Sequence, residues 1–498
     1  MKTLVCFTAA CAAVAGPVWA DSIVPTDMAP TCVVSSDTIN GWFAGGSVAE
    51  NAAIDAPDSV TFTSTYNDDP DRCDFYTWGA QMFLWLTSTD GTKLVLDSPN
   101  FFTIAPVDSS GNRVFIENTA STPTALQVRS GKADTPAGDD IGEIGQAGSS
   151  GVLMSQDSSL VYYGLAANDA YAYFLTGQKD PTSNLASKTT FPYTQADLID
   201  LQTYMSDSWS GTTLLTGNQL AMELKTSWVE ASTLSDSSTY LTIEGTIPNF
   251  VANANNTAMS VDATTPTKTV TLALTGIHVV GTVQDHPEFV WATFEHYNNA
   301  PDAPYYYLAD DGTITLNDFD SNHDFLFMAE SGAQDDANIE CMKANKDGTI
   351  AVNVSGTGEP VCEGGIVPSN TVREYPWGSL ANDPSSATVT NNTLLLSINN
   401  SVRSQLATGD IRANYIQTGS VWTTTPPSGG AAPIPNQTAN QALNLRGSTT
   451  IANMTMETYT QGTNCFSCHN LTEGTPNSFQ AFGLSHVYSE IEPLKPAQ

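Results

Sequence analysis

Residues 270–296 read VTLALTGIHVVGTVQDHPEFVWATFEH, and this stretch decides the expected fold class. Its first half alternates with a two-residue period, which indicates a β-strand that presents one face to a core. The positions that share this face are Val270, Leu272, Leu274, Gly276, His278 and Val280. The run from Phe289 to His296 is rich in aromatic and β-branched residues, so it predicts a second strand. The centre of the chain is therefore expected to be a β-sheet.

Strand-like patterns also lie on both sides of this centre. They occupy residues 93–96, 101–104, 113–116, 151–163 and 412–422, the fourth of them as a hairpin. Helical periodicity marks residues 75–86, 195–205 and 392–407. We expect a mainly β fold with several helices (α+β), in which a large β-rich body carries a small, mostly helical C-terminal segment.

Composition sets limits on the partners of this chain. Of its 498 residues, 41% are hydrophobic, which excludes a wholly disordered acidic protein. The chain has 17 Lys and Arg against 52 Asp and Glu, a formal net charge of −35. Nucleic-acid binding requires clustered cationic side chains, so it is excluded, and an anionic membrane surface is disfavoured. The charge indicates either solubility or attraction of a basic partner protein.

The first twenty residues predict a secretory signal peptide. A basic start is followed by an apolar stretch at 4–14 and by the small-x-small sequence Val18-Trp19-Ala20. We expect cleavage after Ala20 and a periplasmic or secreted protein. No later window reaches the roughly 18 consecutive apolar residues of a membrane helix, so no membrane span is expected in the mature chain.

The C-terminal region contains Asn464-Cys465-Phe466-Ser467-Cys468-His469. C-x-x-C-H is the attachment signature of a c-type haem. Two thiols add across the haem vinyl groups, and the adjacent histidine supplies a nitrogen ligand to the iron. A thioredoxin-like dithiol is the alternative, but it would be expected at a strand end in a βαβ unit. The motif predicts one covalent haem c on Cys465 and Cys468, with His469 as the proximal ligand.

Four cysteines remain outside the signal peptide and the haem motif. Disulfides persist in the oxidising compartment that export implies. Of the three pairings that four cysteines allow, proximity in the sequence favours Cys32 with Cys73 and Cys341 with Cys362.

The sixth iron ligand has several candidates. His486 is the only histidine downstream of the motif, and a fold-back from His469 is within the reach of the chain. Upstream lie Met454 and Met456, in a stretch from 451 to 459 whose spacing predicts a helix. A histidine of another region and an open iron site are the remaining alternatives.

Residues 425–436 are rich in Pro and Gly and form the clearest linker in the chain. They separate a large β-rich domain at 21–424, which is one body or two subdomains, from a haem-binding segment at 437–498. This segment is short for enclosing a haem, so we expect the large domain to contribute to the pocket.

Other polar groups are candidates for metal-binding sites. His278, Glu295 and His296 lie on the two predicted central strands, and with His286 they are candidate ligands for Zn or Fe. The alternatives are a place near the haem and plain hydrogen bonding in the core. The acidic stretches 67–71 and 317–324 suggest Ca²⁺, but neither fits the EF-hand loop. Acidic surface turns are the favoured interpretation of both.

Several segments resemble a group of secreted bacterial proteins called cytochrome c family proteins. The resemblance is carried by Gly276-Ile277-His278-Val279-Val280, by Trp291-Ala292-Thr293-Phe294-Glu295-His296-Tyr297-Asn298-Asn299-Ala300-Pro301, and by Met456-Glu457-Thr458-Tyr459 with the C-F-S-C-H motif. It implies a protein with a single c-type haem and a large companion domain. It implies no particular reaction.

Three functions agree with these features. The first is electron transfer in the periplasm with a redox partner protein, for which the acidity favours a basic partner. The second is a haem-dependent oxidoreductase of peroxidase or oxygenase type, which needs an open iron position and a substrate site in the large domain. The third is a binding module with a structural haem. Electron transfer requires the fewest further assumptions, and whether the protein is an enzyme stays open.

Overall fold

The computed structural model describes residues 24–62, 73–108, 110–119, 121, 123–126, 147, 150–209, 211–320, 323–329, 332–345, 347–423, 445–469, 481–485 and 487–495. The expected signal peptide and the expected linker at 425–436 lie outside these ranges. Among the described helices, none combines the length and apolar character that a membrane crossing requires.

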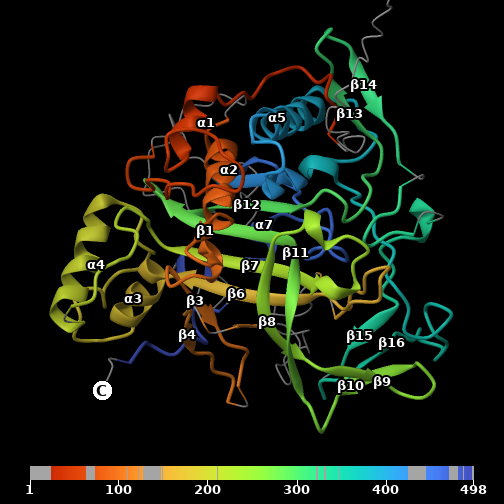
Figure 1. Cartoon of the computed structure of the whole chain (residues 1–498), viewed down its shortest axis with the longest axis horizontal. Coiled ribbons are helices and arrows are strands. Elements are labelled where there is room, and N and C mark those ends of the chain that lie inside the picture. The colour runs from red at the N-terminus through yellow and green to blue at the C-terminus, as the bar shows by residue number, and fades with distance from the viewer. Residues whose placement is uncertain are drawn as a thin grey trace, which may run out of the picture.

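The core of the molecule is a ten-stranded sheet (Figure 1). Its main path runs β18-β17-β12-β11-β7-β6-β3-β4, and β8 and β5 branch from β11. All neighbours are antiparallel except β5 and β8. The strands are β3 (Phe101–Ile104), β4 (Phe115–Glu117), β5 (Thr124–Ala125), β6 (Tyr162–Asn168), β7 (Met222–Glu230), β8 (Thr242–Pro248), β11 (Thr267–Val283), β12 (His286–His296), β17 (Tyr415–Thr423) and β18 (Leu445–Gly447). The predicted central strands are thus β11 and β12. The predicted common face of 270–280 is wrong, because a β-bulge between Leu274 and Gly276 places Leu274 on the opposite face from Gly276 and the residues that alternate with it.

Three smaller sheets surround this core. Their strands are β1 (Thr89–Asp90) with β2 (Lys93–Leu94), β13 (Tyr305–Leu308) with β14 (Ile314–Asn317), and the group β9 (Phe250–Ala252), β10 (Ala258–Val261), β15 (Met342–Ala344) and β16 (Ile350–Val352). Two disulfides join Cys32 to Cys73 and Cys341 to Cys362, with Cα–Cα distances of 5.5 and 5.2 Å. This confirms the predicted pairing, which suits an oxidising compartment.

The helices include the three that periodicity predicted. They are α1 (Ser36–Trp42), α2 (Asp74–Leu86), α3 (Asp169–Gln178), α4 (Gln195–Ser208), α5 (Ser386–Arg403) and the single turn α7 (Cys465–Cys468). Short 3₁₀ turns are η1 (Val95–Asp97), η2 (Ala231–Thr233), η3 (Ser237–Thr239), η4 (Gln334–Asp336), η5 (Pro376–Gly378), η6 (Ile411–Asn414) and η7 (Ala481–Leu484). The mainly β, α+β class is therefore confirmed.

Both faces of β12 are covered, because successive side chains of a strand point to opposite faces of the sheet. On one face, Phe294 stacks on Phe83 of α2 with ring centroids 4.6 Å apart. On the other face, Trp291 contacts Phe466 of α7 at 5.8 Å. Every residue of β12 is buried as a result. The C-x-x-C-H motif therefore lies on the face opposite α2.

The described part of the C-terminal segment is less helical than the expectation. It consists of β18, the single turn α7 and the 3₁₀ turn η7, joined by turns and extended chain. Residues 451–459, whose spacing predicted a helix, form turns. The backbone N–H groups of Asn453 and Thr455 donate to the side-chain oxygens of Glu457 and Asn453, not to carbonyls one helical turn back. The side chains of Asn453 and Thr455 bond to the sheet, which fixes the loop in this conformation. Because β18 pairs with β17, this segment also adds a strand to the main sheet.

Candidate functional site

The C-x-x-C-H motif occupies α7 and the residue that follows it. The backbone N–H of His469 donates to the carbonyl of Cys465 at 2.8 Å, which closes one helical turn. Residues three and four apart lie on one side of a helix. The turn therefore brings the backbone at positions 465, 468 and 469 together within one helical turn.

The imidazole of His469 is held in one orientation. Its Nδ1 lies 2.8 Å from the carbonyl oxygen of Leu484, and its ring lies 4.4 Å from the ring of Trp291. A carbonyl can only accept, so Nδ1 donates, and the lone pair of the neutral ring is then on Nε2. Donation of the second ring nitrogen to a carbonyl is typical of metal-ligating histidines.

Aromatic residues form the wall behind His469. Phe466 is fully buried against Trp291, whose indole N–H donates to the carbonyl of Glu288 at 3.2 Å. Phe482 stacks on Tyr488 at 4.5 Å and also contacts Phe191. The side of the motif that faces the sheet is therefore apolar and excludes water.

Residues 481–485 and 487–495, which we name the C-terminal strap, lie across this wall. Lys179 at the end of α3 donates to the carbonyls of Tyr488 and Ile491, both at 2.7 Å. Buried Arg113 pairs with Glu490 at 2.9 Å. Because the strap carries Leu484, these anchors hold the carbonyl that orients His469.

Glu223 of β7 lies beneath the strap. Its carboxyl group is hydrogen-bonded to Ser485, and Arg113 is the nearby cation. Burial raises the pKa of Glu223 to about 7, and the opposing effects of Ser485 and Arg113 do not cancel this rise. An acid of this pKa is poised to change charge near neutral pH.

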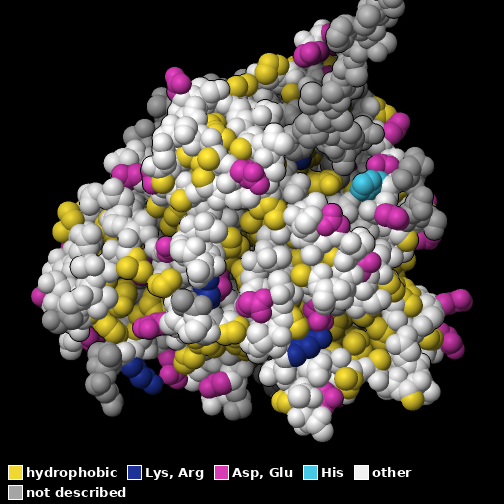
Figure 2. Space-filling model, in the orientation of Figure 1, with side chains coloured by type: hydrophobic (Ala, Val, Ile, Leu, Met, Phe, Trp, Pro, Cys, Tyr) yellow, Lys and Arg dark blue, Asp and Glu magenta, His cyan; other side chains and the backbone are white. Residues whose placement is uncertain are grey.

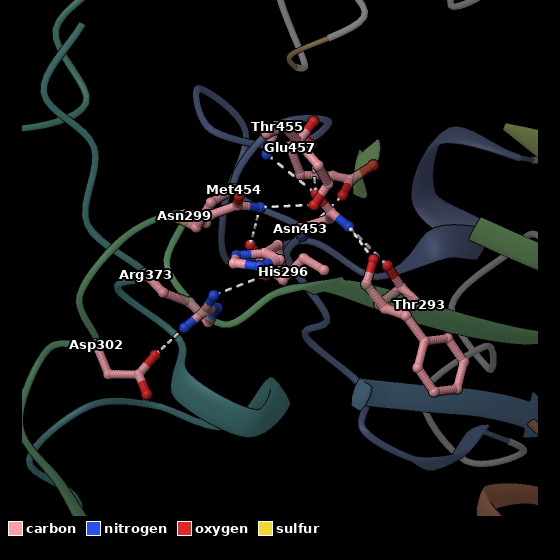
Figure 3. Close-up of polar contacts among 12 residues, drawn as sticks. Thr293, His296, Asn299, Asp302, Arg373, Asn453, Met454, Thr455 and Glu457 are labelled. Carbon is pink, nitrogen blue, oxygen red and sulfur yellow. Dashed lines mark hydrogen bonds and ion pairs between the residues drawn. The ribbon is translucent and has the colours of Figure 1, made fainter. Parts of the chain in front are cut away.

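The loop from 448 to 457 crosses the same face of the sheet (Figure 3). The Asn453 amide donates to the Thr293 hydroxyl at 3.0 Å and to the Phe294 carbonyl at 3.1 Å. The carboxylate of Glu457 accepts from the backbone of Asn453 at 2.9 Å. A Cβ on Gly276 would lie 2.8 Å from the Asn453 amide nitrogen, so only glycine allows this approach.

His278 of β11 pairs with Glu457 at 2.8 Å on this face. Burial opposes ionisation of Glu457, but His278 and Lys225 outweigh it, and the pKa of Glu457 is lowered. His278 lies opposite Thr293 in the strand register. This pair is two residues away from the pair Val280 and Trp291, so the two pairs share a face. His278 therefore lies on the same face as the C-x-x-C-H motif, in a separate hydrogen-bonded pair.

The three predicted polar residues do not form a single group. Glu295 pairs with Arg373 at 2.7 Å, whereas His296 points to the opposite face and stacks on Tyr240 at 3.8 Å. Burial lowers the pKa of His296 to about 3, so its ring is neutral. Across the described ranges, no cluster of three or more His, Cys, Asp or Glu side chains is arranged to hold a metal ion.

The other candidates are placed as follows. His286 is the first residue of β12 and contacts Glu288 at 2.7 Å. Met456 is buried in a cluster with Tyr163 and Phe327 that does not include the wall behind His469. His486 and the acidic stretch 67–71 lie outside the described residues, as does part of 317–324.

Sequence reasoning missed two residues of this site. Trp291 was placed on a predicted strand and in the family resemblance but was given no role, and Glu223 was not singled out. A signal for Glu223 existed, because Met222, Leu224 and Trp228 around it predict a buried strand in which a carboxylate is unusual. No local signal could have identified the Leu484 carbonyl.

Comparison with known proteins identifies no relative of this chain. No protein-family model, no curated protein and no solved structure matches the chain. The resemblance described above therefore depends on the quoted motifs alone.

Proposed function

We propose that the protein is an exported c-type cytochrome with one haem, bound covalently through Cys465 and Cys468, that transfers electrons in the periplasm. The observation that carries this proposal is the hydrogen bond from His469 Nδ1 to the Leu484 carbonyl. It leaves Nε2 as the ligand nitrogen, and it occurs at the one histidine that the motif requires. A haem there would supply a one-electron iron couple.

The chain's own residues prepare the site in three ways. Trp291 and the Leu484 carbonyl prevent rotation of the His469 ring. Phe466 and Phe482 keep water from the side that faces the sheet. Lys179 donates hydrogen bonds to the strap and holds it over these aromatic residues. A rigid, dry ligand environment favours electron transfer because little has to rearrange when the charge changes.

The surface suits a basic partner. Arg113, Arg373 and Arg412 are buried, so part of the small cationic content does not reach solvent. In Figure 2, Asp and Glu side chains are scattered over the visible face and Lys and Arg are few. We propose a basic redox protein as the electron-transfer partner.

Covalent attachment is tested first. We expect the double variant Cys465→Ala/Cys468→Ala, produced with export and cytochrome c maturation, to lose the haem stain of the denatured protein because neither thioether bond can form. The matched control is Ser467→Ala, inside the same turn, which should keep the stain. An unstained wild-type protein, or a Cys465→Ala/Cys468→Ala protein that stains like the wild type, would contradict haem attachment at this motif.

The oxidoreductase alternative is separated by spectroscopy on the wild-type protein. Optical and EPR spectra of the ferric form, and CO addition after reduction, report the sixth position. Low-spin iron that ignores CO supports a carrier and excludes an open site. High-spin iron that binds CO would overturn the carrier and favour the peroxidase or oxygenase class.

A further inference from the structure

We propose that Glu223 binds one proton from water when the site at His469 accepts one electron from an external donor protein. Reduction of the site and protonation of this carboxylate are then a single coupled event, in which the carboxylate becomes a neutral acid. This inference rests on the proposed function and adds a regulatory property to the same site. It is carried by two geometric relations between Glu223 and His469.

The first relation is a row of side chains across the sheet. Val280 of β11 lies directly opposite Glu223 of β7 and also directly opposite Trp291 of β12. Directly paired residues share a face, so all three point toward the haem motif. Adjacent strands are about 4.8 Å apart, which puts the backbones of Glu223 and Trp291 about 10 Å from one another. The ring of Trp291 in turn contacts His469.

The second relation runs through the strap. The Glu223 carboxyl group is hydrogen-bonded to Ser485, and the preceding residue, Leu484, supplies the carbonyl that accepts from His469 Nδ1. Ser485 also shares a hydrogen bond with the Tyr171 hydroxyl at 2.8 Å. The carboxylate and the imidazole are thus connected through two consecutive strap residues.

The charged groups around Glu223 do not offset the change in its proton binding that reduction would cause. Arg113 is the facing cation, and it is already paired with Glu490. Tyr171 of α3 faces Glu223 as a neutral phenol, since burial raises the pKa of Tyr171 far above neutral. In the sheet its direct neighbours are Val280 and the β6 residue Ala167, which carry no charge.

The buried position of Glu223 brings its titration into the neutral pH range. Burial raises the pKa of Glu223 to about 7, so both protonation states are within reach at physiological pH. An added electron makes the surroundings more negative, which disfavours the carboxylate and strengthens proton binding. The oxidised site is more positive, which favours the carboxylate and weakens proton binding. Reduction therefore becomes harder as the pH rises through the neutral range.

The test is a spectroelectrochemical titration of the haem-loaded full chain from pH 5 to 9. We expect the wild-type reduction equilibrium to change up to tenfold per pH unit near neutrality, or about 59 mV for one electron. Glu223→Gln keeps the shape of the side chain and should flatten this slope. Glu223→Asp should restore a slope, and Glu244→Gln, an exposed change on β8, should leave it unchanged.

A second measurement does not depend on any variant. Reduction of unbuffered wild-type protein should take up a substantial fraction of one proton per haem at pH 7, because a group with a pKa of about 7 is already partly protonated there, and Glu223→Gln should take up markedly less. A flat wild-type slope, or a slope that persists in Glu223→Gln, would overturn the role of Glu223 while the haem stain still supports the proposed function. A protein without haem would overturn both proposals.

Discussion

The surroundings of each polar residue at this site decide its charge and its partner. His278, Glu295 and His296 look similar in the sequence, yet the first is half of a partly exposed hydrogen-bonded pair, the second is paired to buried Arg373, and the third is a neutral ring. Solvent exposure and the nearest charge decide among these outcomes. Glu223 looks like an ordinary strand acid but has the environment of a titrating group.

Glu223 also predicts how stability depends on pH. Its pKa is about 7 in the folded chain against an ordinary value of 4.5, so between these values the folded state binds a proton that the unfolded state lacks. Stability should therefore fall as the pH rises from about 4.5 to 7. Glu223→Gln should lose this part of the slope and gain, relative to wild type, roughly 1–3 kcal/mol between pH 4 and pH 8.

Urea unfolding of the wild type, of Glu223→Gln and of the exposed control Glu244→Gln at both pH values measures this difference. The control should follow the wild type. An equal pH slope in the wild type and in Glu223→Gln would show that burial does not raise the pKa of this carboxyl group.

Among the elements, the loop at 448–457 depends on glycines in the strands beneath it. It can approach β11 closely because Gly276 has no side chain, and it approaches β17 at Gly419, where a Cβ would lie 2.7 Å from Ser448. The loop atoms cannot move away freely, since Asn453 is bonded to Thr293 and Phe294. Strand glycines of this kind mark places where another segment lies directly on the sheet.

Gly276→Ala should consequently destabilise the fold by about 1–3 kcal/mol, the usual cost of overpacking a tight interior. The added Cβ would lie 2.8 Å from the amide nitrogen of Asn453 and 2.9 Å from the hydroxyl of Ser227. Thermal or urea unfolding measures the loss. The matched control is Gly217→Ala, where a Cβ meets nothing within 4 Å, and a similar loss there would argue against the contact as the cause.

The whole molecule combines a net charge of −35 with an apolar site covered by its own strap. A field of one sign steers oppositely charged proteins toward the surface and thereby raises the association rate, and salt screens this effect. The charge thus gains a functional interpretation only together with the proposed electron transfer.

We expect the rate of electron exchange with a basic redox protein to fall about tenfold or more as ionic strength rises from 0.01 to 0.2 M. Stopped-flow kinetics with a basic and an acidic partner of similar potential measures this, and the acidic partner should show a weak or opposite dependence. A rate indifferent to salt with the basic partner would leave the charge as a solubility feature alone.

Local patterns in the sequence were sufficient for β11, β12, the three longer helices α2, α4 and α5, the C-x-x-C-H motif and both disulfides. These features depend on periodicity, on adjacent residues or on cysteines close together in the chain. The helix expected at 451–459 was wrong because side-chain oxygens of the loop accept from its backbone N–H groups, while the side chains of Asn453 and Thr455 bond to distant strands. Periodicity reports which residues prefer burial and does not report which polar partners will meet them.

Only the tertiary structure decided what surrounds His469. The row Glu223, Val280 and Trp291 depends on strand register across residues that are far apart in the chain, and the Leu484 carbonyl depends on where the strap folds back. Such contacts form because the whole apolar surface is buried together, and no short window of sequence contains them. The sequence by itself determined which residues are candidate haem ligands, and packing decided which groups orient His469 and which carboxylate shares its face of the sheet.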